Sequence, residues 1–418
     1  MSRITPAHEA FLADFAVMSS HGATRGGGVE RQAATAADHE NRAWFAGWLQ
    51  DHGVRVEVDA VGNMFGLVEL RPGAPWILTG SHLDSQPLAG RFDGAYGVLA
   101  SAHASARVAE GVRSGQVEAR YNLAVVNWFN EEGSRFAPSL MGSSVFTGKL
   151  SLDSALAIID HDGVSVADAL GAGLAPTASK PERHDVAQYA EIHIEQGRSL
   201  EEQGTSIGLV TGTWAAAKYR VRVLGEQSHT GSTRMSDRRD ALHGAALVIV
   251  AARDVTDTAP VDVLHSSVSE LYVLPNSPVT VAREVTMNLD LRSCDEAELA
   301  RAVEAITTRI HEAEAISGCR IELTPTHRWG LLAYHPEGVE LAAEAANDLG
   351  LSHVRLLTLA GHDSTNLKDV VPTIMLFVPS HEGISHNERE YTEDAHLLAG
   401  LDLLERVLAR MVAGDLRP

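Results

Sequence analysis

Five short motifs concentrate histidine and carboxylate side chains, the residue types that bind divalent metal ions through nitrogen and oxygen. They are Gly80-Ser81-His82-Leu83-Asp84, Gly90-Arg91-Phe92-Asp93-Gly94-Ala95-Tyr96-Gly97, Asn130-Glu131-Glu132-Gly133, His193-Ile194-Glu195-Gln196-Gly197 and Ser385-His386-Asn387-Glu388. Together they supply five candidate ligands, His82, Asp93, Glu132, His193 and His386. Such a set suits two borderline ions that share a bridging carboxylate. We therefore predict two divalent metal ions per chain, with zinc as the expected ion and manganese, cobalt or nickel as alternatives.

Each motif taken alone also has an ordinary structural interpretation. A strand-end histidine such as His82 is more often structural, Asp93 could cap a helix beside glycine turns, and Glu131-Glu132 could be a solvated charge pair. Two details favour a metal-binding or catalytic role for these motifs. Asp84 follows His82 by two residues and could accept the second ring N–H. Adjacent carboxylates point to opposite sides of an extended backbone, so one could bind a metal ion while the other accepts and donates protons during catalysis.

Apolar runs typical of buried strands precede these motifs. Candidate strands cover residues 76–78, 123–129 and 192–194, a helical pattern covers 97–108, and another candidate strand covers 373–378. Alternating strand and helix periodicity without an internal repeat predicts an α/β fold. Because ligands bind beyond the carboxyl ends of parallel strands, we expect the motifs to meet at one edge of a mostly parallel central sheet.

The segment 213–327 has a different pattern. Apolar and charged residues alternate over 219–223, which predicts a strand with one solvent-exposed face. A helical pattern follows at 241–252. Two strand patterns, a second helix and a last short strand come next, around residues 268–273, 285–291, 299–310 and 321–323. This order is typical of a small ferredoxin-like α+β domain. We therefore predict that 213–327 is inserted into a domain formed by 1–212 and 328–418.

Composition narrows the class of protein. The 418 residues carry a formal net charge of -21, which disfavours nucleic acid and anionic membranes as partners. The 2 cysteines, Cys294 and Cys319, provide no disulfide framework. No apolar run approaches the ~20 residues that span a bilayer, and the first 18 residues lack an export signal. These features predict a cytoplasmic, two-domain enzyme.

The motifs together resemble the hydantoinase/carbamoylase branch of the M20 metallopeptidase clan. This branch includes N-carbamoyl-L-amino-acid hydrolases, β-ureidopropionases and allantoate amidohydrolases. The likeness runs from Gly62-Asn63 to Glu390-Tyr391-Thr392. It implies a di-metal aminopeptidase-like catalytic domain with an inserted lid domain that also forms a homodimer.

The resemblance also implies roles for individual residues. Asp93 would bridge the metals, with His82 and His193 on one ion and Glu132 and His386 on the other. Three further groups of residues carry the remaining roles: Asp84 supports His82, Glu131 is the general base, and Gln196, Gly361 and His362 contact the substrate.

In the inserted domain, the resemblance falls on Gln227-Ser228-His229-Thr230-Gly231-Ser232-Thr233, Asn276 and Arg292. It implies that His229 polarises the scissile carbonyl across the dimer, while Asn276 and Arg292 hold the substrate carboxylate. Both residues also have an ordinary structural interpretation: His229 could simply lie in a turn, and Arg292 could be a strand residue on the solvent-exposed face.

Two positions depart from the family pattern. Arg234 replaces a proline, and Leu359-Ala360-Gly361-His362-Asp363 replaces a Ser-Gly-Ala-Gly-His-Asp run. Both lie where substrate or dimer contacts are expected, so the reaction type is better defined than the substrate.

The predicted reaction is hydrolysis of the ureido C–N bond of an N-carbamoyl amino acid, giving the amino acid, carbon dioxide and ammonia. Asp84-Ser85-Gln86-Pro87 and Ile384-Ser385-His386-Asn387-Glu388 favour this substrate class by resemblance to β-ureidopropionases. The alternatives are an allantoate amidohydrolase and a dipeptidase or aminoacylase of the same clan. A non-enzymatic relative should lack a ligand or Glu131, and none of these residues is missing.

Overall fold

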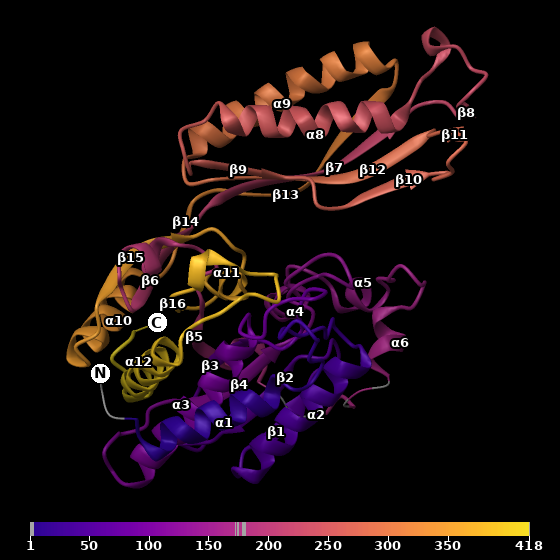
Figure 1. The fold of residues 1–418 in the computed structure, drawn as a ribbon. Helices are drawn as coiled ribbons and strands as arrows, with labels where there is room; N and C mark the ends of the chain where they lie inside the picture. Colours follow the sequence, from indigo (N-terminus) through magenta and orange to yellow (C-terminus); the bar gives the residue numbers. More distant parts are fainter. Residues whose placement is uncertain (1–3, 172, 174, 178–180, 418) are drawn as a thin grey trace. The chain divides into compact units, whose positions relative to one another are not determined.

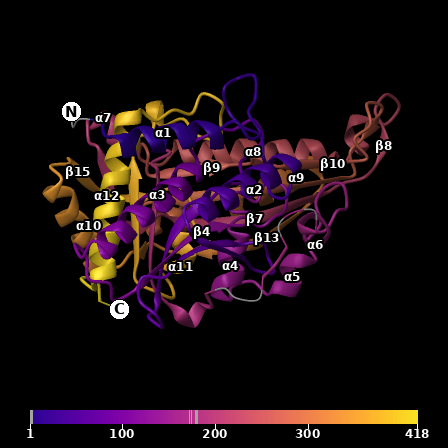
Figure 2. The ribbon, with the colours of Figure 1, turned by 90° about the horizontal axis from the view of Figure 1, so that it is seen from below.

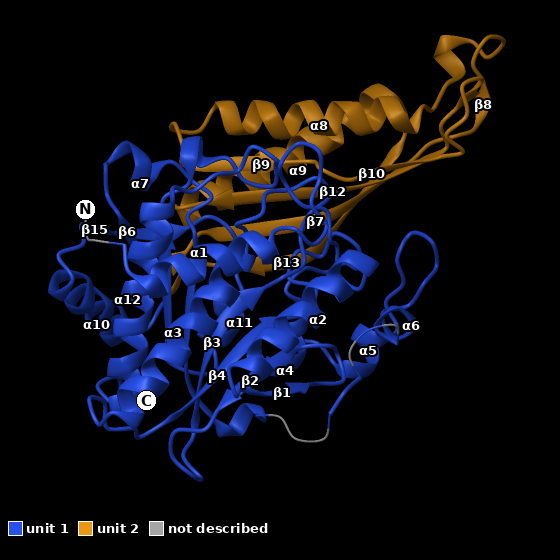
Figure 3. Ribbon diagram, turned by 60° about the horizontal axis from the view of Figure 1, so that its bottom comes forward, with its two compact units in different colours: residues 1–211, 334–418 blue, residues 212–333 orange. Residues whose placement is uncertain are grey.

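The structure is a computed structural model that describes residues 4–171, 173, 175–177 and 181–417. The chain divides into two compact units, which are coloured separately in Figure 3. Unit 1 comprises Met1–Thr211 and Tyr334–Pro418, and unit 2 comprises Gly212–Ala333. Within the described ranges, no helix combines the length and the apolar character needed to cross a membrane.

The centre of unit 1 is a nine-stranded sheet (Figure 1), of which only β14 and the last two residues of β6 belong to unit 2. Its strand order is β1-β2-β4-β3-β5-β16-β6-β14, with β15 beside β6. The four central strands β4, β3, β5 and β16 are parallel, and the pairs β1–β2, β2–β4, β16–β6 and β6–β14 are antiparallel. The predicted α/β fold with a mostly parallel central sheet is confirmed. The strands are β1 (Arg55–Val58), β2 (Met64–Val68), β3 (Trp76–His82), β4 (Asn122–Trp128), β5 (Val186–Ile194), β6 (Ile207–Thr213), β14 (Leu332–Ala333), β15 (His353–Thr358) and β16 (Thr373–Val378).

Helices cover both faces of this sheet. Neighbouring residues of β3, Ile77 and Leu78, belong to different apolar clusters because successive side chains point to opposite faces. On one face α3 packs against β3, β4 and β5, and α1 and α12 pack against α3 (Figure 2). On the other face α11 packs against α4, β5 and β16. The helices are α1 (Pro6–Met18), α2 (Ala36–Asp51), α3 (Ala95–Arg113), α4 (Met141–Thr147), α5 (Leu152–Leu156), α6 (Val166–Leu170), α7 (Ser199–Glu202), α10 (Pro336–Asp348), α11 (Ser364–Leu367) and α12 (Asp394–Ala413).

Unit 2 is an antiparallel sheet with two helices packed against each other and against its strands. The strand order is β10-β12-β7-β13, and β9 also pairs with β12. With β9 and β10 sharing one edge, this is the strand order of a ferredoxin-like domain. The helices are α8 (Ala241–Asp257) and α9 (Glu296–Ser317); the strands are β7 (Ala215–Leu224), β8 (Ser228–His229), β9 (Leu264–Ser267), β10 (Leu271–Leu274), β11 (Thr280–Val281), β12 (Glu284–Ser293) and β13 (Arg320–Trp329).

The single strand expected around 268–273 is wrong, because the structure has two short strands there. β9 ends at Ser267 and β10 begins at Leu271, and both pair with β12. At the interruption, Asn288 Oδ1 accepts hydrogen bonds from Ser269 N (3.1 Å) and Glu270 N (2.8 Å). The Asn288 side chain therefore supplies the acceptor for these two N–H groups, while Asn288 N still donates to the Glu270 main-chain oxygen at 3.3 Å. The apolar pattern of the sequence does not record this interruption.

Candidate metal centre and active site

The predicted site residues of unit 1 gather at the carboxyl ends of the four parallel strands. His82 is the last residue of β3, His193 lies in β5, and Glu131 and Glu132 follow β4. His386 follows β16. These residues are far apart in the sequence. They lie close together because β4, β3, β5 and β16 are parallel neighbours, whose carboxyl ends meet at one edge of the sheet.

Asp93 lies between two groups of potential ligands. Its Oδ1 is 3.0 Å from His193 Nε2 and 3.4 Å from His82 Nε2. Its Oδ2 is 3.2 Å from His386 Nε2, and that nitrogen is 3.4 Å from Glu132 Oε2. In each group, His82-Asp93-His193 and Asp93-Glu132-His386, the ligand atoms lie within 4.8 Å of one another. Asp93 is thus the one carboxylate common to both groups.

Hydrogen bonds at Nδ1 orient two histidines so that Nε2 is the ring nitrogen that can bind a metal; His193 Nε2 also accepts a hydrogen bond from Gly94 N at 3.0 Å. His82 Nδ1 is 2.9 Å from the Asp84 main-chain oxygen, and His193 Nδ1 is 2.8 Å from the Ile194 main-chain oxygen. Since a carbonyl can only accept, each Nδ1 carries the hydrogen and each Nε2 keeps its lone pair. Both lone pairs face Asp93.

These observations fit two divalent ions. At metal–ligand distances of about 2.0–2.2 Å, the donors of a tetrahedral site are separated by roughly 3.3–3.6 Å, close to the spacings found here. Burial opposes protonation of His82, but Glu131 and Asp93 outweigh it and raise its pKa well above the ordinary value. The cluster therefore stabilises positive charge among its carboxylates, which a bound cation also supplies. Zinc, manganese, cobalt and nickel all accept such nitrogen and oxygen donors.

Asp84 supports the site in a different way from the one expected. Its carboxylate lies 3.7 Å from His82 Nδ1, whereas its main-chain oxygen is the closer partner. The carboxylate instead accepts hydrogen bonds from Glu131 N (3.2 Å) and Glu132 N (3.3 Å). Asp84 therefore fixes the backbone that presents both glutamates.

The two adjacent glutamates face different partners. Glu131 Oε2 lies 3.5 Å from His82 Nε2, while Glu132 faces His386 and accepts a hydrogen bond from Gln86 Nε2 at 2.9 Å. Burial raises the pKa of the Glu131 carboxyl well above its ordinary value, although His82 opposes the shift. A carboxylate with a raised pKa accepts a proton more readily, as a general base must.

The substrate-contact residues predicted in unit 1 lie beside the candidate ligands. Gln196 Nε2 donates to Asp93 Oδ2 at 2.8 Å and to Ser385 Oγ at 3.0 Å. The buried His362 ring packs against His193, with ring centroids 4.5 Å apart. Gly361 precedes His362 and is partly exposed. Contact with a substrate stays a prediction for all three.

The predicted residues of unit 2 are divided between the two ends of its sheet. Arg292 pairs with Ala216 near one end of β12, whereas His229 pairs with Thr280 beyond the other end (Figure 1). Asn276 follows β10, whose Leu274 pairs with Glu284, so it lies at the His229 end. Unit 2 therefore does not bring Asn276 and Arg292 together within one chain.

The local contacts of His229 and Arg292 differ. His229 is exposed, and its Nδ1 accepts hydrogen bonds from Gly231 N (2.9 Å) and Ser232 N (3.2 Å), so Nε2 carries the hydrogen and can donate to a carbonyl. Arg292 is bound to Asp290, with Nη2 2.8 Å from Asp290 Oδ2. A substrate carboxylate would have to share this guanidinium with Asp290.

Three supporting residues had no predicted role. Gln86 holds Glu132, and Ser385 Oγ donates to Glu390 Oε2 at 2.7 Å. Glu390 Oε1 also accepts from Phe92 N (3.0 Å) and Asp93 N (3.1 Å). Gln86 and Glu390 occur in segments quoted for the family resemblance, but their partners are far away in sequence and could not be inferred from spacing.

Comparison with known proteins identifies the family. The profile of peptidase family M20/M25/M40 matches residues 78–410. The chain belongs to this family. A protein of Mycolicibacterium smegmatis whose name specifies only a hydrolase is 56% identical over 410 residues, 97% of this chain and 93% of that protein. An N-carbamoyl-L-amino-acid amidohydrolase of Rhizobium meliloti is 35% identical and covers 90% of both chains.

Other relatives agree on the family and differ in substrate. An allantoate amidohydrolase of Bacillus subtilis is 30% identical over 94% of this chain and 95% of that enzyme. A crystal structure of a hydantoinase/carbamoylase family amidase from Burkholderia vietnamiensis matches with a TM-score of 0.89 and 34% identity, over 98% of each chain. The predicted family and the prediction of a hydrolase acting on C–N bonds are confirmed.

Proposed function

We propose that this chain hydrolyses the ureido C–N bond of an N-carbamoyl amino acid, releasing ammonia, carbon dioxide and the amino acid. Two divalent metal ions would be held by His82, Asp93, Glu132, His193 and His386. The proposal includes a homodimer and a cytoplasmic location, as predicted from the sequence. The observation that carries it is the placement of Asp93, whose two oxygens face separate donor groups with the buried Glu131 beside one of them.

In the proposed reaction, Glu131 takes a proton from the attacking water as its oxygen bonds to the ureido carbonyl carbon. The bound ions supply Lewis-acid polarisation of that carbonyl. His229 Nε2–H from a partner chain donates a hydrogen bond to the carbonyl oxygen. Glu131 then returns the proton to the departing nitrogen, which leaves as ammonia. The remaining carbamate loses carbon dioxide to give the amino acid.

Allantoate is the second candidate substrate, because it also carries a ureido group and a carboxylate. The similarity to the Bacillus subtilis allantoate amidohydrolase supports it. A dipeptidase or aminoacylase activity would use the same groups on a different amide.

Two measurements, ammonia release and the formation of free amino acid, decide between these substrates, because acetyl amino acids and dipeptides yield amino acids without ammonia. The purified protein would be stripped with a chelator, reloaded separately with zinc, manganese, cobalt or nickel, and offered N-carbamoyl-β-alanine, N-carbamoyl-L-amino acids, allantoate, N-acetyl amino acids and dipeptides. We expect ammonia from N-carbamoyl amino acids only after reloading. Cleavage of acetyl amino acids or dipeptides alone would contradict the proposal, and faster release from allantoate would select the second candidate.

A further inference from the structure

Arg31 of unit 1 lies almost entirely inside the protein, with 1% of its surface exposed. Its guanidinium donates to three main-chain oxygens, those of Leu83 (2.9 Å), Met18 (3.1 Å) and His21 (3.1 Å). Met18 is the last residue of α1, and the main-chain oxygens at a helix end have no partner within the helix. The side chain therefore joins the end of α1 to the residue that follows the candidate ligand His82.

The main chain of Arg31 contacts the same segment. Its N–H donates to Ser85 Oγ at 3.0 Å, and its main-chain oxygen accepts from Ser85 N at 3.2 Å. Arg31 thus contacts both sequence neighbours of Asp84, which are Leu83 and Ser85. Because the residue on each side is held, the main-chain conformation of Asp84 is held as well.

Asp84 in turn contacts three residues of the candidate metal centre. Its main-chain oxygen lies 2.9 Å from His82 Nδ1. Its carboxylate accepts hydrogen bonds from Glu131 N (3.2 Å) and Glu132 N (3.3 Å). Such partners orient the metal ligands, and losing one typically weakens metal binding about 10–100-fold. Asp84 therefore connects Arg31 to the residues that would bind the ions.

The positive charge of Arg31 opposes its own burial. Burial lowers the pKa of the guanidinium to about 10, although the carboxylates of Asp38 and Asp84 oppose the shift, so the side chain is protonated at neutral pH. A buried charge is weak evidence for stability, because a well-packed apolar side chain in its place is often neutral or stabilising. What a guanidinium offers is a rigid, planar set of donors that neither lysine nor an apolar residue reproduces.

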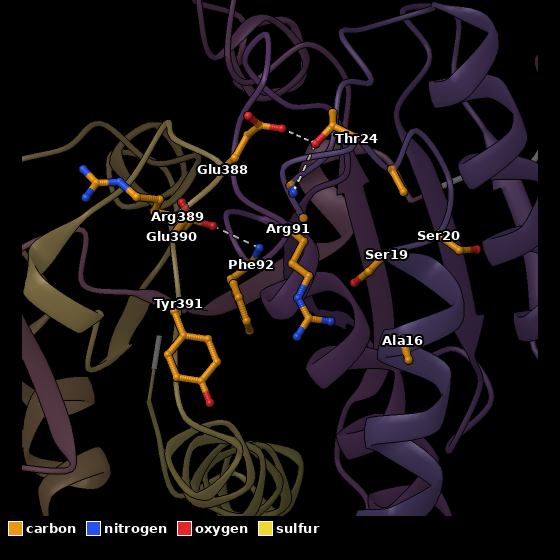
Figure 4. Close-up of a pocket in the computed structure, with 13 residues that line it drawn as sticks. Ala16, Ser19, Ser20, Thr24, Arg91, Phe92, Glu388, Arg389, Glu390 and Tyr391 are labelled. Atoms are coloured by element: carbon orange, nitrogen blue, oxygen red, sulfur yellow. Dashed lines mark hydrogen bonds between the residues drawn. The ribbon is translucent and has the colours of Figure 1, made fainter.

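The end of α1 also borders the segment that carries the bridging ligand. Phe15 of α1 packs against Phe92, with ring centroids 5.4 Å apart, and Phe92 directly precedes Asp93. Ser19, which follows α1, lines one pocket together with Phe92 (Figure 4). The helix end that Arg31 joins to residues 83–85 is therefore adjacent to a second part of the metal centre.

We infer that Arg31 is a positioning residue of the metal centre, which holds Leu83 and Ser85 so that Asp84 can orient His82 and both glutamates. The inference rests on the metal centre of the proposed function and not on the identity of the substrate. The structural alternative is that Arg31 only closes the end of α1. Its loss would then destabilise the fold without a specific effect on metal binding.

The zinc affinity of the full chain, measured by competition with a chromogenic chelator, tests the inference. We expect Arg31→Met and Arg31→Lys each to weaken zinc binding about 10–100-fold. Lysine should not rescue, because one ammonium group cannot replace the planar fork. Ser85→Ala removes a neighbouring contact and leaves the buried charge in place, so it should weaken zinc binding by a smaller factor. This variant keeps the test valid if the Arg31 variants fail to fold.

Arg107→Met is the matched control. Arg107 is a partly buried arginine that joins α3 to α12 through Asp402 and Glu405, at 3.2 Å each. Its loss should lower the melting temperature and leave the zinc affinity unchanged. A second comparison adds Arg31→Met to Asp84→Ala. There the further loss of zinc affinity should be clearly smaller than in the wild type, because the contact from residue 84 to the glutamates is already absent.

Four results would overturn the inference: unchanged zinc affinity in Arg31→Met, wild-type affinity in Arg31→Lys, an equal loss in Arg107→Met, or equal fold losses with and without Asp84→Ala. Ammonia release reports the proposed reaction separately. Arg31-dependent zinc binding without hydrolysis of any ureido substrate would contradict the reaction and support the inference. Normal turnover with unchanged zinc affinity in the Arg31 variants would contradict the inference alone, and a wild-type chain that binds no zinc would overturn both.

Discussion

Asp93 organises the candidate metal centre because each of its oxygens faces a different group of donors. The backbone around it is also constrained. Asn130, Gln196 and His386 have positive φ angles of 52°, 57° and 53°. This left-handed backbone conformation destabilises the folded state by about 1–3 kcal/mol for each residue other than glycine. Surrounding hydrogen bonds hold these conformations, as between Gln196 N and Ser380 Oγ at 3.0 Å. Strain at three positions of one site indicates that side-chain placement there serves function.

The first prediction separates the two adjacent glutamates. Glu131→Gln should keep near-normal metal content and lower turnover about 10²–10⁴-fold, the usual scale for a general base. Glu132→Gln is the matched control and should lose metal, because Glu132 lies in the second donor group. Metal analysis and ammonia release measure the two effects. Loss of both metals in Glu131→Gln would show that the two roles are assigned the wrong way round.

The second prediction concerns recognition of the substrate carboxylate by Arg292. Arg292→Lys should slow turnover of carboxylate-bearing substrates, because lysine cannot form the paired hydrogen bonds of a guanidinium. A neutral ureido amide of the same side chain is the control substrate and should be affected much less. Equal slowing of both would mean that Arg292 acts by supporting unit 2 through its bond to Asp290.

At the scale of elements, the sequence predicted the strands that carry the site better than the contacts between them. The buried runs at 76–78, 123–129 and 373–378 lie in or along β3, β4 and β16 because continuous apolar runs mark strands buried on both faces. The hydrogen bond from Asp93 N to Glu390 joins residues 297 positions apart, and no local pattern encodes such a contact. The interruption opposite Asn288 was missed for the same reason.

The third prediction tests the start of α3, which positions Asp93. Gly94 has φ 64°, donates its N–H to His193 Nε2 at 3.0 Å, and lies so close to the His82 ring that an added Cβ would overlap it. Gly94→Ala should therefore destabilise the protein by at least about 1–3 kcal/mol and impair metal binding.

Gly47→Ala is the matched control, since Gly47 lies within α2 and an added Cβ there meets nothing within 4 Å. It should stabilise the protein by about 0.5–1 kcal/mol. Denaturant unfolding and metal analysis measure both variants. Normal metal binding by Gly94→Ala would show that the His82 ring can move without loss of the site.

At the scale of the whole molecule, the arrangement within unit 2 bears on assembly. Arg292 lies eight residues along β12 from Glu284, roughly 27 Å at 3.4 Å per residue, and His229 lies beyond the Glu284 end. A small substrate cannot contact both residues of one copy of unit 2. If both act on one substrate, two copies of the chain must contribute, which supports the proposed homodimer.

The fourth prediction is that two inactive variants restore activity when their subunits mix. His229→Ala lacks the residue donated to the partner, and Glu131→Gln lacks its own general base. A mixed dimer then contains one intact site and one site damaged twice. Random exchange should return about a quarter of wild-type activity, because half the dimers are mixed and each has one good site. Mass measurement confirms that subunits have exchanged.

The matched control mixes Glu131→Gln with His193→Ala. In the mixed dimers of this control, each catalytic site keeps the defect of its own chain, so no activity should return. If the first mixture stays inactive after confirmed exchange, His229 does not act on the partner's substrate, and the proposed dimeric site is wrong.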